Sequence, residues 1–156
     1  ANRRAFDAAL GRPGRSDDRP ALLMIDIDNF KHINDRLGHD EGDQAIALLG
    51  TRIARTAPKG SCVARLGGEE FAVLLNDGGL SVANTTARAL HRALANKDRA
   101  LDFTISIGIA EGARSELYRR ADEAVYDAKR QGRNRTCVWQ PASQECEKAQ
   151  PAVLTA

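Results

Sequence analysis

The sequence predicts an α+β domain, with helices packed on a mostly antiparallel central sheet in a sandwich of the ferredoxin-like kind. Three observations support this fold class. Short apolar runs alternate with segments whose apolar residues recur every three or four positions. Gly67-Gly68 separates two of the short runs, which is typical of a β-hairpin. Strand–helix units flank this hairpin, giving the order α-β-α-α-β-β-α-β-α-β.

The first third of the chain predicts a strand between two helices. A helix over Arg3 to Leu10 precedes a polar loop, residues 11–18, which contains two glycines and a proline. The almost continuous apolar run from Ala21 to Ile27 indicates a strand covered on both faces. A short helix is expected from about Phe30 to Leu37, followed by a loop over Gly38 to Asp43.

The middle of the chain contains the hairpin. A helix over Gln44 to Arg55 has apolar residues spaced for one buried face. The hairpin strands are Cys62 to Leu66 and Glu70 to Leu75. Ser81 to Ala95 is helical by pattern, and strict alternation over Phe103 to Ile109 indicates another strand.

The last elements are a helix and an edge strand. Ser115 to Gln131 carries an apolar stripe, and Gly132 is placed to cap the C-terminus of this helix. Thr136 to Trp139 has the pattern of a final strand. The chain then turns polar, so we expect one domain over residues 1–139 and a disordered tail over residues 140–156.

Composition excludes several classes of protein. Of the 156 residues, 42% are hydrophobic, enough for one core without metal or disulfide staples. The net charge is +2 with no dense basic block, so a nucleic-acid partner is not expected. No apolar run approaches the ~20 residues of a membrane span. Three cysteines without a Cys-x-x-Cys pair favour an intracellular, cytoplasmic setting. The first residue is Ala1, so we expect an upstream sensor or dimerisation segment to be missing.

Acidic residues follow the first strand. Asp26 and Asp28 flank Ile27, and the two-residue period of a strand places both carboxylates on one face. Such a pair suits a hard cation such as Mg²⁺, although two solvated acids leaving a strand would look the same. Asn29 is placed to cap the next helix, whose N-terminus beside Lys31 would attract an anion. An ordinary capped helix with an exposed lysine is the alternative.

Two further charged pairs stand out. Glu69 and Glu70 follow the glycine turn and should point to opposite sides of the sheet, so one of them can join Asp26 if the hairpin pairs with the first strand. Lys129 and Arg133 are four residues apart and share a helical face if the last helix extends that far. They suit a terminal phosphate, or simply favourable charge at a helix C-terminus.

The order of these motifs is more specific than any one of them. The motifs are Asp26-Ile27-Asp28-Asn29-Phe30-Lys31, Ile33-Asn34-Asp35, Gly38-His39, Gly42-Asp43, Arg65-Leu66-Gly67-Gly68-Glu69-Glu70-Phe71, Thr104-Ile105-Ser106-Ile107-Gly108-Ile109, Ala121-Asp122, Tyr126, Ala128-Lys129 and Gly132-Arg133-Asn134. Together they resemble the GGDEF family of diguanylate cyclases, in its GGEEF variant, over nearly the whole chain from Asn2 to Trp139. The resemblance implies a nucleotidyl-cyclase-like sheet and a bacterial signalling enzyme.

The resemblance also implies a role for each matching position. Asp26, the Ile27 carbonyl and Glu69 would bind Mg²⁺, with Mn²⁺ as a possible substitute, whereas Asp28 is not the usual direct ligand. Glu70 would be the second essential acid of the hairpin. Substrate binding is implied for Asn34 and Asp43 at the guanine and for Asn29, Phe30, Lys31, Lys129 and Arg133 at the phosphates.

The implied reaction condenses two GTP molecules into cyclic di-GMP and two pyrophosphates, across a homodimer in which each domain binds one GTP. Two alternatives are a degenerate domain that binds GTP without turnover and regulates a partner, and another nucleotidyl cyclase or polymerase palm-like domain. Many relatives bind their product through an Arg-x-x-Asp motif ahead of the hairpin. Here that segment is Pro58-Lys59-Gly60-Ser61, which lacks both anchors; a weaker site assembled from Arg88 or Arg92 is the alternative.

Overall fold

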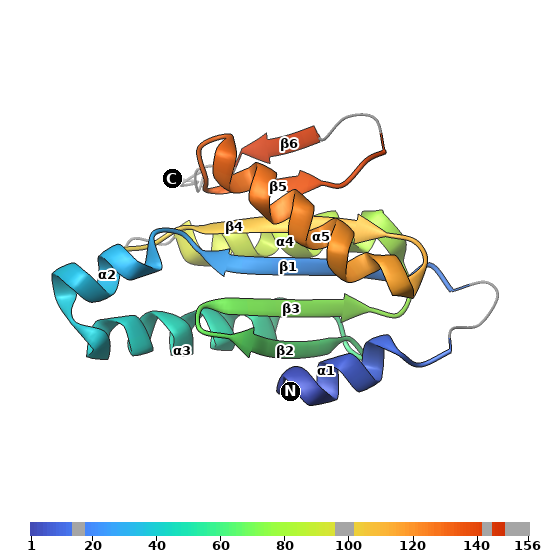
Figure 1. Ribbon diagram of the computed structural model, residues 1–156, viewed down its shortest axis with the longest axis horizontal. Helices are drawn as coiled ribbons and strands as arrows, with labels where there is room; N and C mark the ends of the chain where they lie inside the picture. Colours follow the sequence, from blue (N-terminus) through green and yellow to red (C-terminus); the bar gives the residue numbers. More distant parts are fainter. Residues whose placement is uncertain (14–17, 96–101, 142–144, 149–156) are drawn as a thin grey trace, which may run out of the picture.

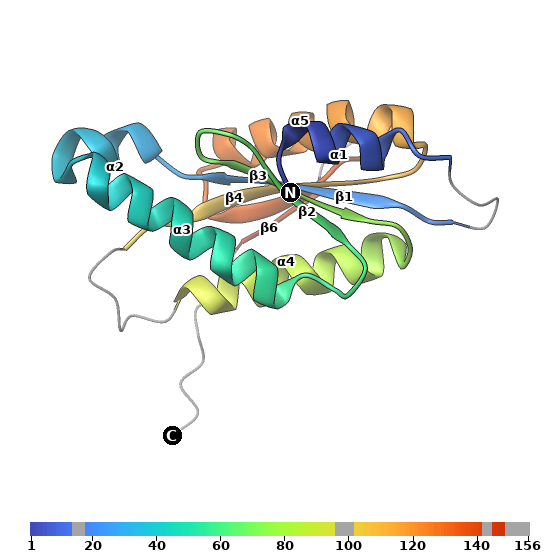
Figure 2. The ribbon, with the colours of Figure 1, turned by 90° about the horizontal axis from the view of Figure 1, so that it is seen from below.

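In the computed structural model, a central sheet lies between two helical layers (Figures 1 and 2). The structure describes residues 1–13, 18–95 and 102–141, and the backbone of residues 145–148. Within these residues the strands are β1 (Ala21–Ile27), β2 (Cys62–Gly67), β3 (Glu70–Leu75), β4 (Ile105–Glu111), β5 (Arg135–Val138) and β6 (Glu145–Lys148). The helices are α1 (Arg3–Leu10), α2 (Phe30–Leu37), α3 (His39–Thr56), α4 (Gly79–Ala95) and α5 (Arg114–Arg130).

The sheet has the strand order β2-β3-β1-β4-β5-β6. Every neighbouring pair is antiparallel except β4 and β5, which run parallel. The two central strands, β1 and β4, are paired along their whole lengths, from Ala21 opposite Glu111 to Ile27 opposite Ile105. The predicted α+β class and the mostly antiparallel sheet are therefore confirmed.

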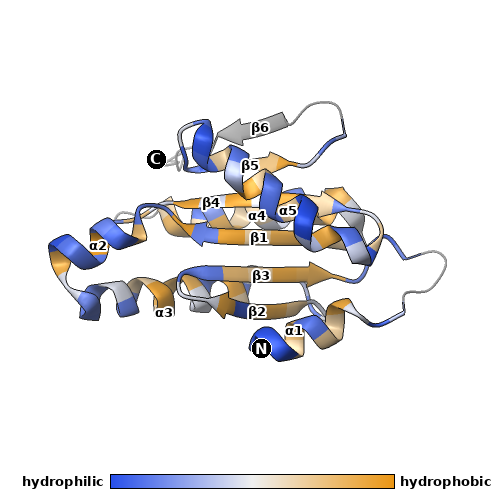
Figure 3. Cartoon of the chain, viewed as in Figure 1, coloured by the Kyte–Doolittle hydropathy of each residue, from blue (hydrophilic) through white to orange (hydrophobic). Residues whose placement is uncertain are grey.

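Strand β1 is buried on both faces because each face meets a helical layer (Figures 2 and 3). Leu23 and Ile25 belong to the core cluster that contains residues of α3 and α4. Leu22 and Met24 belong to the cluster that contains Phe6 of α1 and the apolar stripe of α5. Because side chains alternate along a strand, the next even-numbered residue, Asp26, also faces the α5 layer.

A glycine allows α5 to pack directly on the sheet. A Cβ atom built on Gly108 of β4 would lie 2.1 Å from the Ala121 carbonyl oxygen and 2.4 Å from the Val125 backbone nitrogen. These atoms are helix backbone, so no side-chain rearrangement can make room. The residue thus sets how closely the helix approaches β4.

Two sequence predictions about the chain's organisation need correction. The expected loop over Gly38 to Asp43 is a single residue, Gly38 with φ 97°, and α3 begins at His39. Acidic residues in the first turn of α3 favour this early start through the helix dipole. Strand β6 also lies within the segment expected to be a disordered tail, where it pairs with β5. Residues 142–144 and 149–156 of that tail lie outside the described residues.

One buried histidine links α4 to β5. Nε2 of His91 lies 3.1 Å from Oγ1 of Thr136, and the imidazole is buried. Burial lowers the pKa of His91 to about 4, against a smaller opposing effect from the negative charge of Asp28. The native imidazole therefore stays neutral well below the pH at which an exposed histidine is protonated.

We predict that His91 makes the domain less stable in acid. Between pH 6.5 and 4 the unfolded chain binds a proton at His91 and the native chain does not, so stability falls as the pH falls. Relative to a His91→Gln variant, the wild type should lose roughly 2 to 3 kcal/mol of unfolding free energy between pH 7 and pH 4.5. Urea denaturation at both pH values measures this difference, and parallel profiles for the two proteins would contradict the assignment.

We also predict that Gly108→Ala destabilises the domain by about 3 kcal/mol or more, because the methyl group overlaps helix backbone. Gly50→Ala in α3 is the matched control. Its new methyl group would meet only the Phe71 ring, at 3.4 Å, and alanine favours helix by up to about 1 kcal/mol. Chemical denaturation of both variants provides the measurement. Equal changes in unfolding free energy for the two variants would show that stability does not depend on how closely α5 approaches β4.

Candidate functional site

The charged residues singled out from the sequence gather at one end of the sheet. The end of β1, the β2–β3 hairpin and the C-terminal end of α5 lie together at the left of Figure 1, where α2 also begins. Asp26 of β1 is directly opposite Glu70 of β3 in the antiparallel ladder. Directly opposed residues of such a ladder share a face, so both acids lie on the side of the sheet covered by α5.

Asp26 is the buried centre of this end. Its side chain is 9% exposed, and its Oδ2 lies 2.8 Å from Nζ of Lys129 on α5. Burial raises the pKa of the Asp26 carboxyl, the hydrogen bond and charge of Lys129 lower it, and the charges of Glu69 and Glu70 raise it again. The site therefore collects three acids and one cation within electrostatic reach.

The hairpin acids are placed differently from the prediction. Gly68 and Glu69 form the turn between β2 and β3, so the alternation expected for strand residues does not apply to Glu69. The Arg65 side chain braces the turn by donating from Nε to the Gly68 carbonyl, 2.9 Å away. Glu69 is half-buried, whereas Glu70 is exposed at the first position of β3.

The predicted capping of α2 by the Asn29 side chain is wrong. Asn29 has a left-handed backbone, φ 55°, and its side chain makes no capping hydrogen bond. Its carbonyl instead accepts from the backbone N–H groups of His32 and Ile33, at 2.8 and 3.2 Å. Asparagine tolerates this conformation better than most residues. Phe30 is half-buried against the core, and Lys31 is exposed in the first helical turn.

A second polar cluster lies where α2 meets α3. The Oδ1 atom of Asn34 is buried and has no hydrogen-bond partner among the described residues. Gly42 of α3 makes room for this side chain, since a Cβ atom there would lie 1.9 Å from Oδ1. Asp43 follows Gly42 and is exposed. A buried polar group without a partner is costly, so Asn34 is suited to receive a ligand.

The two cations near the end of α5 do not share a helical face as expected. The helix ends at Arg130, and Arg133 lies in the following turn with φ 62°. Lys129 contacts Asp26, whereas Arg133 is exposed. The turn is nevertheless held beside the acids, because the backbone N–H of Asn134 donates to Oδ2 of Asp28.

The oxygen donors at this end of the sheet fit a hard cation whose coordination shell is completed by a bound ligand. Among the described residues, no three His, Cys, Asp or Glu side chains gather as a complete metal site. Asp26 supplies a buried carboxylate whose negative charge requires compensation. Mg²⁺ is often bound by only one or two carboxylates, with waters and substrate phosphates filling the remaining positions. An incomplete set of protein ligands is therefore what such an ion requires.

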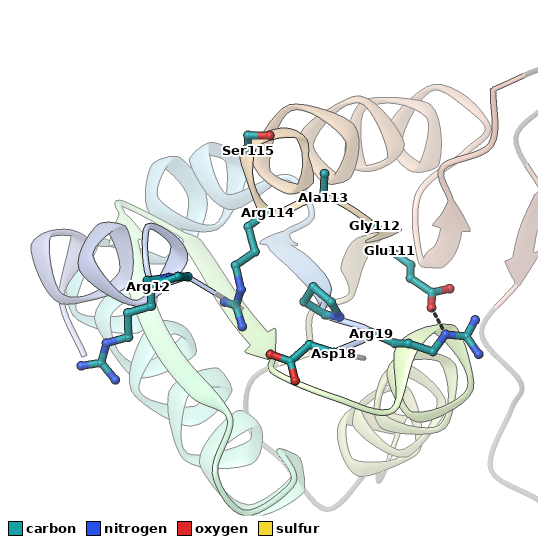
Figure 4. A pocket seen from close by; sticks show the side chains of 10 residues that line it. Arg12, Asp18, Arg19, Glu111, Gly112, Ala113, Arg114 and Ser115 are labelled. Atoms are coloured by element: carbon teal, nitrogen blue, oxygen red, sulfur yellow. Dashed lines mark hydrogen bonds and ion pairs between the residues drawn. The ribbon is translucent and has the colours of Figure 1, made fainter. Parts of the chain in front are cut away.

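A cavity lies away from these residues. A hollow of about 760 Å³ opens at the opposite end of the sheet, near the start of β1 and the end of β4 (Figure 4). Its lining includes Arg12, Arg19, Glu111 and Arg114. Nε of Arg19 donates to the Glu111 carboxylate at 2.9 Å. Because its charges are partly paired and it is remote from Asp26, we do not assign the chemistry to this cavity.

Comparison with known proteins identifies the family. The family model described as "Diguanylate cyclase, GGDEF domain" matches residues 1–135, so the chain belongs to the GGDEF family. Diguanylate cyclase DgcM of Escherichia coli is 44% identical over 121 residues, which are 74% of this chain and 30% of DgcM. The response regulator PleD of Caulobacter vibrioides is 38% identical over 83% of this chain and 31% of its own length.

Solved structures agree with the match. The GGDEF domain of PA1120 from Pseudomonas aeruginosa superposes with a TM-score of 0.84 at 34% identity, covering 90% of this chain and 96% of that one. The active GGEEF domain of a diguanylate cyclase from Vibrio cholerae gives a TM-score of 0.76 at 31% identity, covering 90% and 92%.

The chain spans about a third of the length of DgcM and PleD. Within the described residues, no helix combines the length and apolarity needed to cross a bilayer.

Proposed function

We propose that this domain is a diguanylate cyclase, which condenses two GTP molecules into cyclic di-GMP and two pyrophosphates. The observation that carries the proposal is the meeting of Asp26, Glu70 and Lys129 at the end of the sheet where α2 begins. Acids and a cation in one place suit phosphoryl transfer, in which positioning and charge neutralisation supply most of the catalysis.

The guanine and the phosphates would occupy different parts of this end. Asn34, whose Oδ1 has no hydrogen-bond partner among the described residues, and Asp43 would bind the guanine edge between α2 and α3. The phosphates would bind Lys31, Lys129 and Arg133 and the backbone N–H groups near Asn29 and Phe30. The helix N-terminus supports this placement, because the Asn29 side chain makes no hydrogen bond to it.

The metal would be Mg²⁺, with Mn²⁺ as a substitute, held by Asp26, the Ile27 carbonyl and Glu69. The ion would neutralise phosphate charge and activate the 3′-hydroxyl for attack. Glu70 would accept a proton near that hydroxyl, since it lies opposite Asp26 and is exposed. Each domain binds one GTP, so the complete site requires a second copy facing the first. We place this reaction in the cytoplasm, where GTP is available.

The direct test is to incubate the purified domain with GTP and Mg²⁺ and to identify the product by mass spectrometry. Cyclic di-GMP and pyrophosphate are expected, and ATP in place of GTP should give no cyclic dinucleotide. GTP binding without any product over a wide range of protein concentration would instead support the regulatory alternative.

We predict that Glu69→Gln lowers turnover by about 100-fold or more, because a neutral amide holds the metal cation that neutralises the phosphates more weakly than a carboxylate does. The substitution preserves size, and Glu69 lies in a turn, so folding should be unaffected. Glu123→Gln, the same change at a surface carboxylate of α5, is the control and should retain full activity. Near-normal synthesis by the Glu69 variant would exclude the metal assignment.

We further predict that added cyclic di-GMP does not inhibit this enzyme from a second site. A hollow of about 250 Å³ beside Pro58 is lined by neutral residues: Thr56, Pro58, Ser81, Val82, Thr85, Thr86 and Ala89. A phosphodiester ligand needs cationic donors, which an arginine fork provides and these side chains do not. Initial rates with added product, together with calorimetric titration, measure this. Tight saturable binding accompanied by non-competitive inhibition would show that other arginines, such as Arg88 or Arg92, form the site.

A further inference from the structure

Asp28 is buried and fully engaged by other parts of the chain. Its side chain accepts hydrogen bonds from Ser106 Oγ and Thr104 Oγ1, both at 2.6 Å, and from the backbone N–H of Asn134 at 2.9 Å. The residue is 4% exposed, and its own N–H donates to the Thr104 carbonyl. One carboxylate thus joins the end of β1, the start of β4 and the turn after α5.

That turn needs an external restraint. Three successive residues, Gly132, Arg133 and Asn134, have positive φ angles of 112°, 62° and 47°. The left-handed region is unfavourable for side-chain-bearing residues, so surrounding contacts must hold the last two there. One such contact is the hydrogen bond from the Arg133 N–H to the Ala128 carbonyl, and another is the hydrogen bond from the Asn134 N–H to Asp28.

The restrained turn carries the proposed phosphate-binding arginine. Arg133 projects from the turn, and Lys129, four residues earlier, reaches Asp26. Asp26 lies on β1 and Asp28 is the first residue after it, so the same end of the strand contacts both α5 and the turn that follows α5. By holding this turn, Asp28 therefore fixes how far Arg133 lies from the acids at the end of β1.

We propose that Asp28 is a positioning residue that determines affinity for the triphosphate of GTP by fixing the Arg133 turn against the end of β1; this inference rests on the proposed function. A direct metal-ligand role fits the geometry less well. Both carboxylate oxygens already accept short hydrogen bonds from described residues, which a cation would have to displace. Asp28 acts through the turn and does not touch the substrate.

The test separates the phosphate end of the nucleotide from the guanine end. Calorimetry in Mg²⁺ compares α,β-methylene-GTP, which retains three phosphates and cannot be cyclised, with GMP, which lacks the outer two. Asp28→Asn keeps the shape and replaces one acceptor oxygen with a donor. We expect about tenfold weaker binding of the triphosphate analogue, the loss typical of one disrupted charged hydrogen bond, and unchanged binding of GMP.

Two further variants keep the test decisive. Thr104→Val removes a single donor and keeps the shape, so it should give a smaller loss with the same selectivity even if Asp28→Asn does not fold. Thr86→Val is the control, because it removes a buried hydroxyl bond to Val82 within α4, away from the turn. It should lower stability and leave the ratio of the two affinities unchanged.

Equal losses for both nucleotides, or no loss in the Asp28 and Thr104 variants, would overturn the positioning role. If the wild-type domain bound neither nucleotide, the proposed function would fail and this inference with it. If the wild type turned over GTP but the Asp28 and Thr104 variants lost affinity equally for both nucleotides, the positioning role would be refuted and the proposed function would stand.

Discussion

The buried carboxylate of Asp28 connects three parts of the chain that border the candidate site. It accepts hydrogen bonds from Thr104, just before β4, from Ser106 on β4 and from the turn after α5, and it is almost completely buried. Burying an acid is costly unless its hydrogen-bonding capacity is satisfied, so these three donors and the acid require one another. Through them the end of β1 has a fixed relation to the strand and to the turn that border the candidate site.

The position of Lys129 follows from alternation and close packing together. Alternation along β1 turns Asp26 towards the α5 layer, while Gly108 on the neighbouring strand lets the backbone of α5 approach closely. A wider separation would move Lys129 away from the Asp26 carboxylate, which it reaches at 2.8 Å. The need for glycine at position 108 of β4 is thus linked to the pairing of Lys129 with Asp26 at the end of β1.

Most of the fold was predictable because its signals are local. The apolar run at β1 and the glycines before β3 identify their elements, and the ordered motifs identify the family. The role of Asp28 was not predictable from spacing, since Asp26 and Asp28 look equivalent until β4 is known to lie beside β1. Thr104, immediately before that strand, and Ser106, its second residue, were the available signal. Strand β6 has charged residues at three of its four positions, so its sequence gives no apolar strand pattern, and the strand is recognised by its pairing with β5.

A crystal structure of the domain with α,β-methylene-GTP and Mg²⁺ would show directly where the nucleotide binds. We expect guanine between α2 and α3, beside Asn34 and Asp43, and the phosphates between the start of α2 and the Lys129–Arg133 segment. The Asp28 hydrogen bonds should be unchanged. Nucleotide bound instead in the cavity at the opposite end of the sheet, against Arg12 and Arg114, would contradict this placement.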